Sequence, residues 1–216
     1  MSEIKVKVDT HPFNDDLKLY TRKEFTFKPG LTSLVGCNGT GKSTLIDIYI
    51  KQALRKQKIS NFKYNDRRHG GDNLMENMMF HDDMSGFASM FISSEGERIA
   101  LGVGRTFAGL RSFFKENEGK KVVLMFDAID SGMSVDEIIE IRKIFLDTII
   151  PDAINNYGVD LFIIVAANNY EWCNDERIHN MDITSGKELK ITDYESYKKI
   201  ILESRKKKDK VRCVDK

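Results

Sequence analysis

The spacing of hydrophobic and polar positions divides the chain into buried strands and amphipathic helices. Two unbroken apolar runs, at 121–126 and 160–166, predict strands that are covered on both faces of a sheet. Between them, residues 135–156 carry apolar side chains at helical spacing and predict a long amphipathic helix. A strand, a helix and a second strand in succession are typical of a parallel pair, so a largely parallel core sheet is expected.

The remaining elements are shorter. Residues 3–8 and about 17–27 alternate apolar and polar positions, which predicts an antiparallel N-terminal portion with one exposed face. The other predicted elements are strands at 31–35 and 59–64, helices at 45–57, 94–117 and 194–204, and a hairpin at 183–191. The pattern as a whole predicts an α/β fold.

Length and charge limit the organisation of the chain. With 216 residues, it can form one large α/β domain but not two ordinary ones. We expect a single domain over 1–203 with a helical insert at about 66–118, followed by a basic tail at 204–216. The net charge of +1 gives no overall attraction to nucleic acid or membrane.

The sequence predicts a cytoplasmic location. No apolar run approaches the ~18 residues that a membrane span needs, and residues 1–8 lack the apolar core of a signal peptide. The three cysteines, Cys37, Cys173 and Cys213, are scattered and in no metal-binding spacing, which fits free thiols in a reducing compartment.

Residues 36–44 form the most informative segment of the chain. Their sequence, Gly-Cys-Asn-Gly-Thr-Gly-Lys-Ser-Thr, matches the phosphate-binding loop (P-loop) pattern and lies between a predicted strand and a predicted helix. The glycines let successive N–H groups point at phosphate oxygens, and the helix N-terminus adds positive charge. A plain glycine-rich turn is the alternative that this context disfavours. The residues expected to bind the nucleotide here are Gly36, Asn38, Gly39, Thr40, Gly41, Lys42, Ser43 and Thr44.

Asp127 comes directly after the apolar run at 121–126. An Asp at the carboxyl end of such a strand lies beside the P-loop and can bind Mg²⁺ through water, while the hydroxyl of Ser43 can bind Mg²⁺ directly. We therefore expect Ser43 and Asp127 to form the metal site. Lys42 can reach the β- and γ-phosphates of ATP.

The residue after Asp127 is unusual. A hydrolytic site of this kind usually carries a carboxylate there to orient the attacking water, but this chain has Ala128. Losing a general base typically lowers the rate about 10²–10⁴-fold. We expect slow turnover unless another group, such as Asp130, substitutes.

A third element opens the helix predicted at 94–117. Ser94 is a candidate N-cap, and Glu97 three residues later completes a capping box. By itself this pattern indicates an ordinary helix start.

Together, these elements resemble a known family. Residues 93–98, Ser-Ser-Glu-Gly-Glu-Arg, resemble the signature motif of ATP-binding-cassette (ABC) ATPases. The P-loop and the segment Asp127-Ala128-Ile129-Asp130 are similar to those of SMC and RecF-like heads, and the chain resembles an AAA family ATPase of prokaryotic or phage type. The motifs occur in the family's order over roughly residues 25–170.

The resemblance implies a P-loop NTPase fold with an ABC/SMC-head-like sheet, antiparallel N-terminal strands and a small helical insert. It implies ATP and Mg²⁺ as ligands and an ATP-dependent homodimer in which Ser94, Gly96 and Glu97 contact the nucleotide of the second subunit. No heptad run separates the P-loop helix from Ser94, so the head is expected to lack coiled-coil arms. The compartment would be the bacterial cytoplasm, or the host cytoplasm if the protein is phage-encoded.

Some positions depart from the family's pattern. Asn168 stands where the family has its switch histidine, and asparagine can donate to a γ-phosphate but cannot titrate near neutral pH. The resemblance therefore implies Lys42, Asp127 and Asn168 as the catalytic set. Asn65 and Asp66 are the candidates for the Q-loop position, where no glutamine is present.

Two further features leave alternatives open. Phe13 or Tyr20 could stack on adenine, or either could serve in packing. Residues 198–216 hold nine Lys or Arg against three Asp or Glu, which indicates either a solvated tail or a DNA-binding segment through Lys206, Lys207 and Lys208.

The hypothesis from the sequence is an ATP-binding, slowly hydrolysing head that dimerises head to tail on ATP, in prokaryotic or phage DNA maintenance, repair or defence. One alternative is a non-hydrolysing, ATP-gated sensor or interaction protein. Another is the cassette subunit of a membrane transporter, which the short insert disfavours. A P-loop kinase would need an arginine-bearing lid and an acceptor site, neither of which we identify in the sequence.

Overall fold

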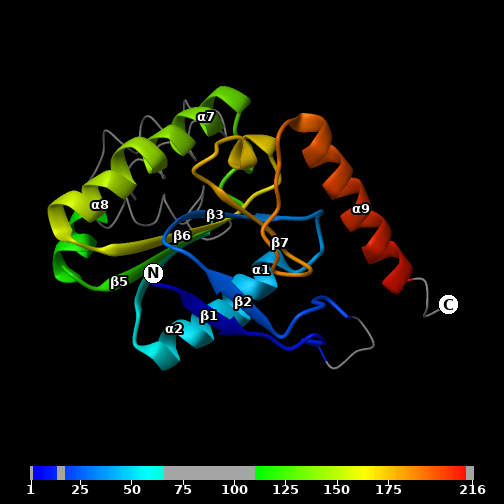
Figure 1. Cartoon of the computed structure of the whole chain (residues 1–216), viewed down its shortest axis with the longest axis horizontal. Coiled ribbons are helices and arrows are strands. Elements are labelled where there is room, and N and C mark those ends of the chain that lie inside the picture. The colour runs from blue at the N-terminus through cyan, green and yellow to red at the C-terminus, as the bar shows by residue number, and fades with distance from the viewer. Residues whose placement is uncertain (1, 14–17, 66–109, 213–216) are drawn as a thin grey trace, which may run out of the picture.

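The computed structural model describes residues 2–13, 18–65 and 110–212 of the chain (Figure 1). Most of the insert predicted at about 66–118 lies outside the described residues. Its last part, residues 110–116, is helical and packs Leu110 and Phe114 into the core.

A five-stranded sheet forms the centre of the molecule, and all of its neighbouring strands are parallel. Its strands, in spatial order, are β4 (Ser60–Asn65), β5 (Lys121–Asp127), β6 (Asp160–Ala166), β3 (Gly30–Val35) and β7 (His179–Asp182). A separate antiparallel pair is formed by β1 (Ile4–Lys7) and β2 (Glu24–Phe27). The predicted α/β class, the largely parallel core sheet and the antiparallel N-terminal strands are confirmed.

The unbroken apolar runs are explained by two hydrophobic layers, one on each face of the sheet. Along β5, Val122, Leu124 and Phe126 belong to one buried cluster, while the alternate residues Val123 and Met125 belong to the other. The same alternation divides the side chains of β6. Because neither face of these strands meets water, apolar residues occupy every position apart from the charged residues at their ends.

Helices and the small sheet provide the two layers (Figure 1). One continuous helical stretch consists of α7 (Val135–Ile144), a π-helical segment η2 (Phe145–Ile149) and α8 (Ile150–Tyr157). On the opposite face lie the antiparallel pair and the stretch formed by α1 (Lys42–Thr44), η1 (Leu45–Ile50) and α2 (Lys51–Gln57). The helices predicted at 45–57 and 135–156 are confirmed.

Three predicted boundaries are wrong. The strand predicted at 17–27 begins only at Glu24, because the preceding segment bonds to loops: the N–H of Leu19 donates to Thr10 and that of Thr21 to Thr184. The hairpin predicted at 183–191 has its first strand earlier, at β7. Its turn is fixed by Asp182, whose carboxylate accepts hydrogen bonds from the Thr184 N–H and the Ser185 hydroxyl.

The last helix, α9 (Tyr194–Arg212), continues past the predicted end at 204. Lysine and arginine are good helix formers, so the basic segment extends the helix to Arg212. A short 3₁₀ helix, η3 (Tyr170–Cys173), which the pattern did not predict, follows β6.

The order of the strands places the candidate site. β5, β6 and β3 are neighbours and parallel, so their carboxyl ends meet at one edge of the sheet. The loops that follow these three strands therefore converge there, as is typical of ligand sites in α/β proteins.

Candidate functional site

The loop between β3 and α1 holds the predicted P-loop residues. Gly39 and Gly41 have φ values of +78° and +93°, which favour glycine. A Cβ atom on Gly41 would lie 2.9 Å from the Tyr20 hydroxyl oxygen, so the loop also lacks room for a side chain there. The glycines are thus required by both backbone conformation and packing.

Tyr20 packs against this loop at Gly41. Its side chain is fully buried, and its hydroxyl donates to the carbonyl oxygen of Gly41 at 2.8 Å. The suggestion that Tyr20 stacks on adenine is therefore wrong, because its ring has no exposed face. Phe13 is half exposed on a turn, and its role as a stacking residue stays a prediction.

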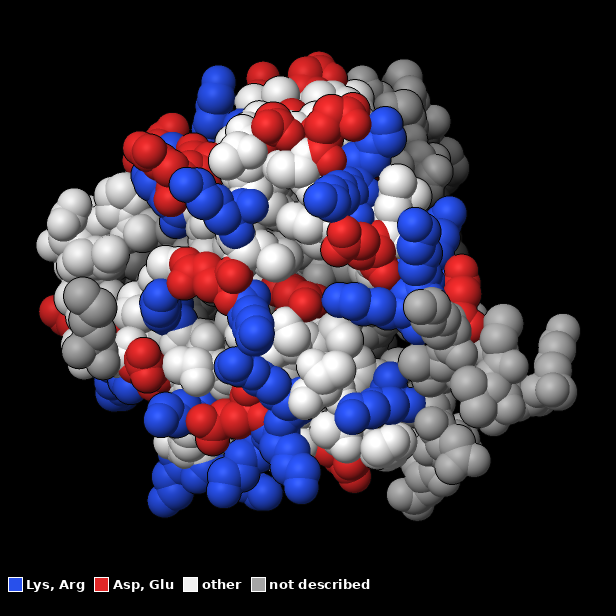
Figure 2. All heavy atoms as spheres, turned by 45° about the vertical axis from the view of Figure 1, so that its right-hand side comes forward, with Lys and Arg blue, Asp and Glu red and all other residues white. Residues whose placement is uncertain are grey.

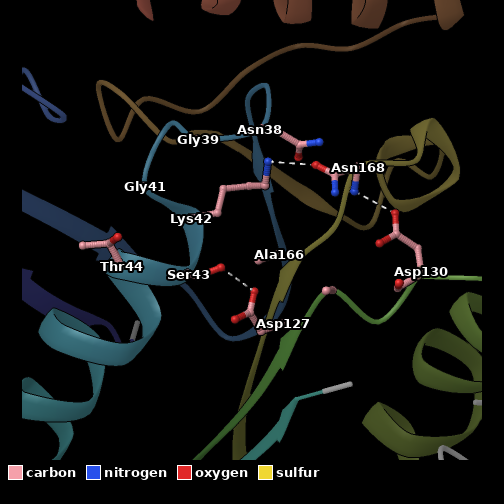
Figure 3. A pocket seen from close by; sticks show the side chains of 12 residues that line it. Asn38, Gly39, Gly41, Lys42, Ser43, Thr44, Asp127, Asp130, Ala166 and Asn168 are labelled. Carbon is pink, nitrogen blue, oxygen red and sulfur yellow. Dashed lines mark hydrogen bonds between the residues drawn. The ribbon is translucent and has the colours of Figure 1, made fainter. Parts of the chain in front are cut away.

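Lys42 is the buried cation of the site. Its side-chain nitrogen donates to the carbonyl oxygen of Gly36 at 2.6 Å and to Oδ1 of Asn168 at 3.0 Å (Figure 3). Burial lowers the pKa of Lys42, and the nearby carboxylates of Asp130 and Asp127 oppose that shift. The ammonium group is thus held across the mouth of the loop, where phosphate oxygens could replace the carbonyl of Gly36 as its acceptor.

Ser43 and Asp127 meet beside the lysine. The Ser43 hydroxyl donates to Oδ1 of Asp127 at 2.9 Å, and Asp127 is 7% exposed (Figure 3). Lys63 also approaches this carboxylate, with its nitrogen 3.7 Å from Oδ2. A hydroxyl and a carboxylate in contact are the hard oxygen ligands that Mg²⁺ prefers, so these two residues fit the metal expected of the site.

Ala128 contributes no functional group to the cavity. Its backbone lies in the left-handed region, with φ of +58°, and its N–H donates to the carbonyl of Ala166 at 2.8 Å. Asp130, the candidate substitute, uses Oδ2 to accept hydrogen bonds from the N–H groups of Asn168 and Asn169, each at 2.7 Å. One oxygen of this carboxylate therefore holds the loop after β6.

These residues enclose one cavity of about 610 Å³. Its lining comes from the P-loop and from the loops after β5 and β6: Asn38, Gly39, Gly41, Lys42, Ser43, Thr44, Asp127, Ala128, Asp130, Ser131, Ala166 and Asn168. The structure thus brings together the predicted catalytic residues and most of the predicted P-loop residues. Gly36 and Thr40 are buried behind it, where the Thr40 hydroxyl donates to the carbonyl of Cys37 at 2.7 Å.

The remaining predicted residues are either undescribed or absent from the described lining of the cavity. Ser94, Gly96 and Glu97 lie outside the described residues, as does Asp66. Asn65 ends β4 and pairs with Asp127 across the sheet.

Helix α9 contributes hydrogen bonds to the loops of the site that were not predicted from the sequence. Tyr197 donates its hydroxyl hydrogen to the carbonyl of Asn168 at 2.7 Å, and the hydroxyl of Ser204 accepts the N–H of Cys37 at 3.2 Å. Lys208 donates to the carbonyl of Asn38 at 3.1 Å. The signal in the sequence was the spacing of these polar residues, which lie on the same helix face as the partly buried Ile200 and Ile201. This spacing indicates a buried face but not the segment that it packs against.

Comparison with known proteins supports the fold. No protein-family model and no curated protein sequence matches the chain. A solved nucleotide-free ATP-binding cassette from an ABC transporter is similar, with a TM-score of 0.51 and 12% identity over 94% of this chain and 99% of that one. A dimeric cassette in a post-hydrolysis state bound to ADP and phosphate gives a TM-score of 0.47 and 11% identity, covering 88% of this chain and 99% of that one.

The first likeness, at this identity, shows the fold: the chain has an ABC-cassette-like α/β P-loop fold. Within the described part of the chain, no helix combines the length and the apolar character needed to cross a membrane.

Proposed function

We propose that the protein binds ATP with Mg²⁺ in the cavity at the carboxyl edge of its sheet and hydrolyses it slowly. One observation carries the proposal: the buried Lys42 ammonium lies at the loop mouth beside the contact between Ser43 and Asp127. The phosphates of ATP need both a cation and a metal ion, and the P-loop pattern supplies the two from adjacent residues, the lysine and the serine that follows it. The ABC-cassette-like fold supports the same ligand.

Four side chains of the cavity and the backbone of the P-loop each have a distinct part in this proposal. Lys42 would hold the β- and γ-phosphates, and the N–H groups of the loop would bind phosphate oxygens. Ser43 and Asp127 would hold Mg²⁺, which when bound neutralises charge on the β- and γ-phosphates. Asn168 would donate its amide N–H to the γ-phosphate, because the lysine already occupies its Oδ1.

Slow turnover follows from two residues that come after Asp127 in the chain, Ala128 and Asp130. Ala128 cannot accept a proton, and Asp130 accepts two backbone N–H groups. Without a general base, the attacking water is oriented poorly and the rate falls by about 10²–10⁴-fold.

The proposal includes a dimer formed head to tail on ATP. It rests on the resemblance of residues 93–98 to the ABC signature motif, which would place Ser94, Gly96 and Glu97 against the nucleotide of the partner. Light scattering on the protein without nucleotide, with ADP·Mg and with ATP·Mg tests it. We expect a dimer only with ATP, lost in Ser94→Arg. A Ser94→Arg protein that dimerises like the wild type would contradict the placement of Ser94 at the dimer interface. A wild type that binds ATP but stays a monomer in every state would contradict the dimer.

A second candidate function is an ATP-gated sensor with no turnover. Ala128 favours this function, because a site without a general base at this position can bind ATP without hydrolysing it. Phosphate release followed in parallel with light scattering separates the two: release from a wild-type dimer supports the slow enzyme, whereas a stable ATP dimer without release supports the sensor.

We also propose that the cellular process involves DNA, in prokaryotic or phage maintenance, repair or defence. The resemblance to SMC and RecF-like heads and the exposed Lys206 and Lys207 of α9 support this. On the face in Figure 2, basic side chains are interspersed with acidic ones, so contact would be local rather than spread over a uniformly positive surface. Binding to duplex DNA should weaken steeply with salt and in Lys206→Glu/Lys207→Glu; affinity unchanged by either would contradict it.

A further inference from the structure

The loop after β6 is held by its main chain from two sides. Oδ2 of Asp130 accepts the N–H of Asn168 at 2.7 Å, and the hydroxyl of Tyr197 donates to the carbonyl oxygen of the same residue at 2.7 Å. Both backbone polar groups of Asn168 are therefore fixed by side chains from different parts of the chain. The Asn169 N–H adds a second bond to the same Asp130 oxygen.

Of the two supporting side chains, Tyr197 differs from Asn168 in its surroundings. Tyr197 is 8% exposed, so its hydroxyl is shielded from water, whereas Asn168 is exposed toward the cavity. Burial also raises the pKa of the Tyr197 hydroxyl, which keeps it protonated and able to donate. A shielded, well-directed hydrogen bond restricts the loop more than an exposed one would.

The same helix holds the P-loop. Ser204 accepts the Cys37 N–H, and Lys208 donates to the Asn38 carbonyl, from the face of α9 that also carries Tyr197. One rigid helix thus contacts both loops that border Lys42, and it sets their separation. This arrangement accounts for the 3.0 Å contact between Oδ1 of Asn168 and the Lys42 nitrogen.

We propose that Tyr197 and Asp130 are positioning residues that hold Asn168 so that its side-chain amide recognises the terminal phosphate of ATP. The inference rests on the proposed function, because it names how that site distinguishes a triphosphate from a diphosphate. With Lys42 on Oδ1, the Nδ2 donor of Asn168 is left for a ligand in the cavity that both residues line, where the γ-phosphate would lie. ADP lacks this phosphate, so the contact strengthens the binding of ATP alone.

The test measures the affinities for ADP·Mg and for a non-hydrolysable ATP analogue with Mg²⁺, using calorimetry. Removing one hydroxyl in Tyr197→Phe should lower the ratio of analogue affinity to ADP affinity by about 3- to 10-fold, with ADP affinity unchanged. Asp130→Ala should lower the same ratio, because it removes the acceptor of the Asn168 N–H on the other side of the loop. In Asn168→Ala the ratio should fall as well, and adding Tyr197→Phe to it should have no further effect.

Tyr194→Phe is the matched control, because it removes the same group from an exposed position of the same helix. Its ratio should equal that of the wild type. Equal losses of analogue and ADP affinity in Tyr197→Phe, or an unchanged ratio in both Tyr197→Phe and Asp130→Ala, would overturn the inference while leaving nucleotide binding intact. A wild-type protein that binds neither nucleotide would overturn the proposed function itself, and the inference with it.

Discussion

Replacing Ala128 with glutamate would add the carboxylate that the proposed ATPase site lacks. Ala128 lines the cavity between Asp127 and the loop after β6, so a longer side chain there can extend toward the space in front of Lys42. The backbone at this position already has a positive φ with a Cβ atom present. Glutamate therefore adds little backbone strain beyond what alanine already carries.

The size of the effect follows from the groups around the new side chain. Asp127 and Asp130 line the same cavity, and their negative charge should raise the pKa of the glutamate above its ordinary value. A raised pKa makes a carboxylate a better general base near neutral pH. We expect hydrolysis to rise by about 10²-fold, the lower end of what a positioned base supplies, because the cavity was not selected around it. The free energy of unfolding should change by less than about 1 kcal/mol, since the side chain is only half-buried.

The assay is phosphate release in a single turnover, with enzyme in excess over ATP·Mg. Ala128→Gln is the control, because it has the same length without a base. The reasoning predicts a fast Ala128→Glu variant and an Ala128→Gln variant at or below the wild-type rate. Equal rates for all three proteins, when each still binds ATP, would refute the claim that a missing base limits turnover.

Three further predictions concern the scaffold of the site. In Gly36→Ala, the new Cβ would lie 2.4 Å from Cγ2 of Ile183, so we expect a loss of about 1–3 kcal/mol of stability by thermal melting; an unchanged midpoint would contradict this packing. Glu171→Ala leaves the nearly buried Arg142 without its 2.8 Å ion-pair partner, and urea denaturation should show a loss of about 3 kcal/mol, not the fraction of a kcal/mol typical of a surface pair. Burial raises the pKa of the Cys173 thiol to about 11, so only about 0.1% is thiolate at pH 8. Mass spectrometry after iodoacetamide treatment should find Cys173 unmodified in the folded protein at pH 8, with modification increasing as the pH approaches 11; rapid modification at pH 8 would contradict its burial.

The core of the fold could be predicted because its signals are local. The runs at 121–126 and 160–166 are apolar at every position after the first residue, which only strands covered on both faces require. The P-loop is equally readable, since glycine spacing and the Lys-Ser pair are fixed by the geometry of a strand, a turn and a helix. The adjacency of Ser43 and Asp127 then follows from the parallel order of β3, β6 and β5.

The features that were not predicted correctly from the sequence depend on contacts between distant segments. The sequence left Tyr20 as either an adenine-stacking or a packing residue, and the fold buries it under Gly41. The segment before Glu24 alternates like a strand, yet its N–H groups bond to loops. Tyr197 and Ser204 could not be assigned to the site, because nothing in the sequence says that α9 packs on the P-loop. These contacts arise from tertiary packing, which periodicity does not encode.

The central claim, that the cavity binds ATP with Mg²⁺, is tested most directly by calorimetric titration of ATP·Mg into the wild type and Lys42→Ala. Lys56→Ala, which removes an exposed lysine from α2, serves as the matched control. We expect saturable binding of one nucleotide per chain. The affinity should fall at least about 10-fold in Lys42→Ala, since a charge-assisted contact is lost, and stay unchanged in Lys56→Ala. No binding by the wild type, or equal affinity in the wild type and Lys42→Ala, would contradict it.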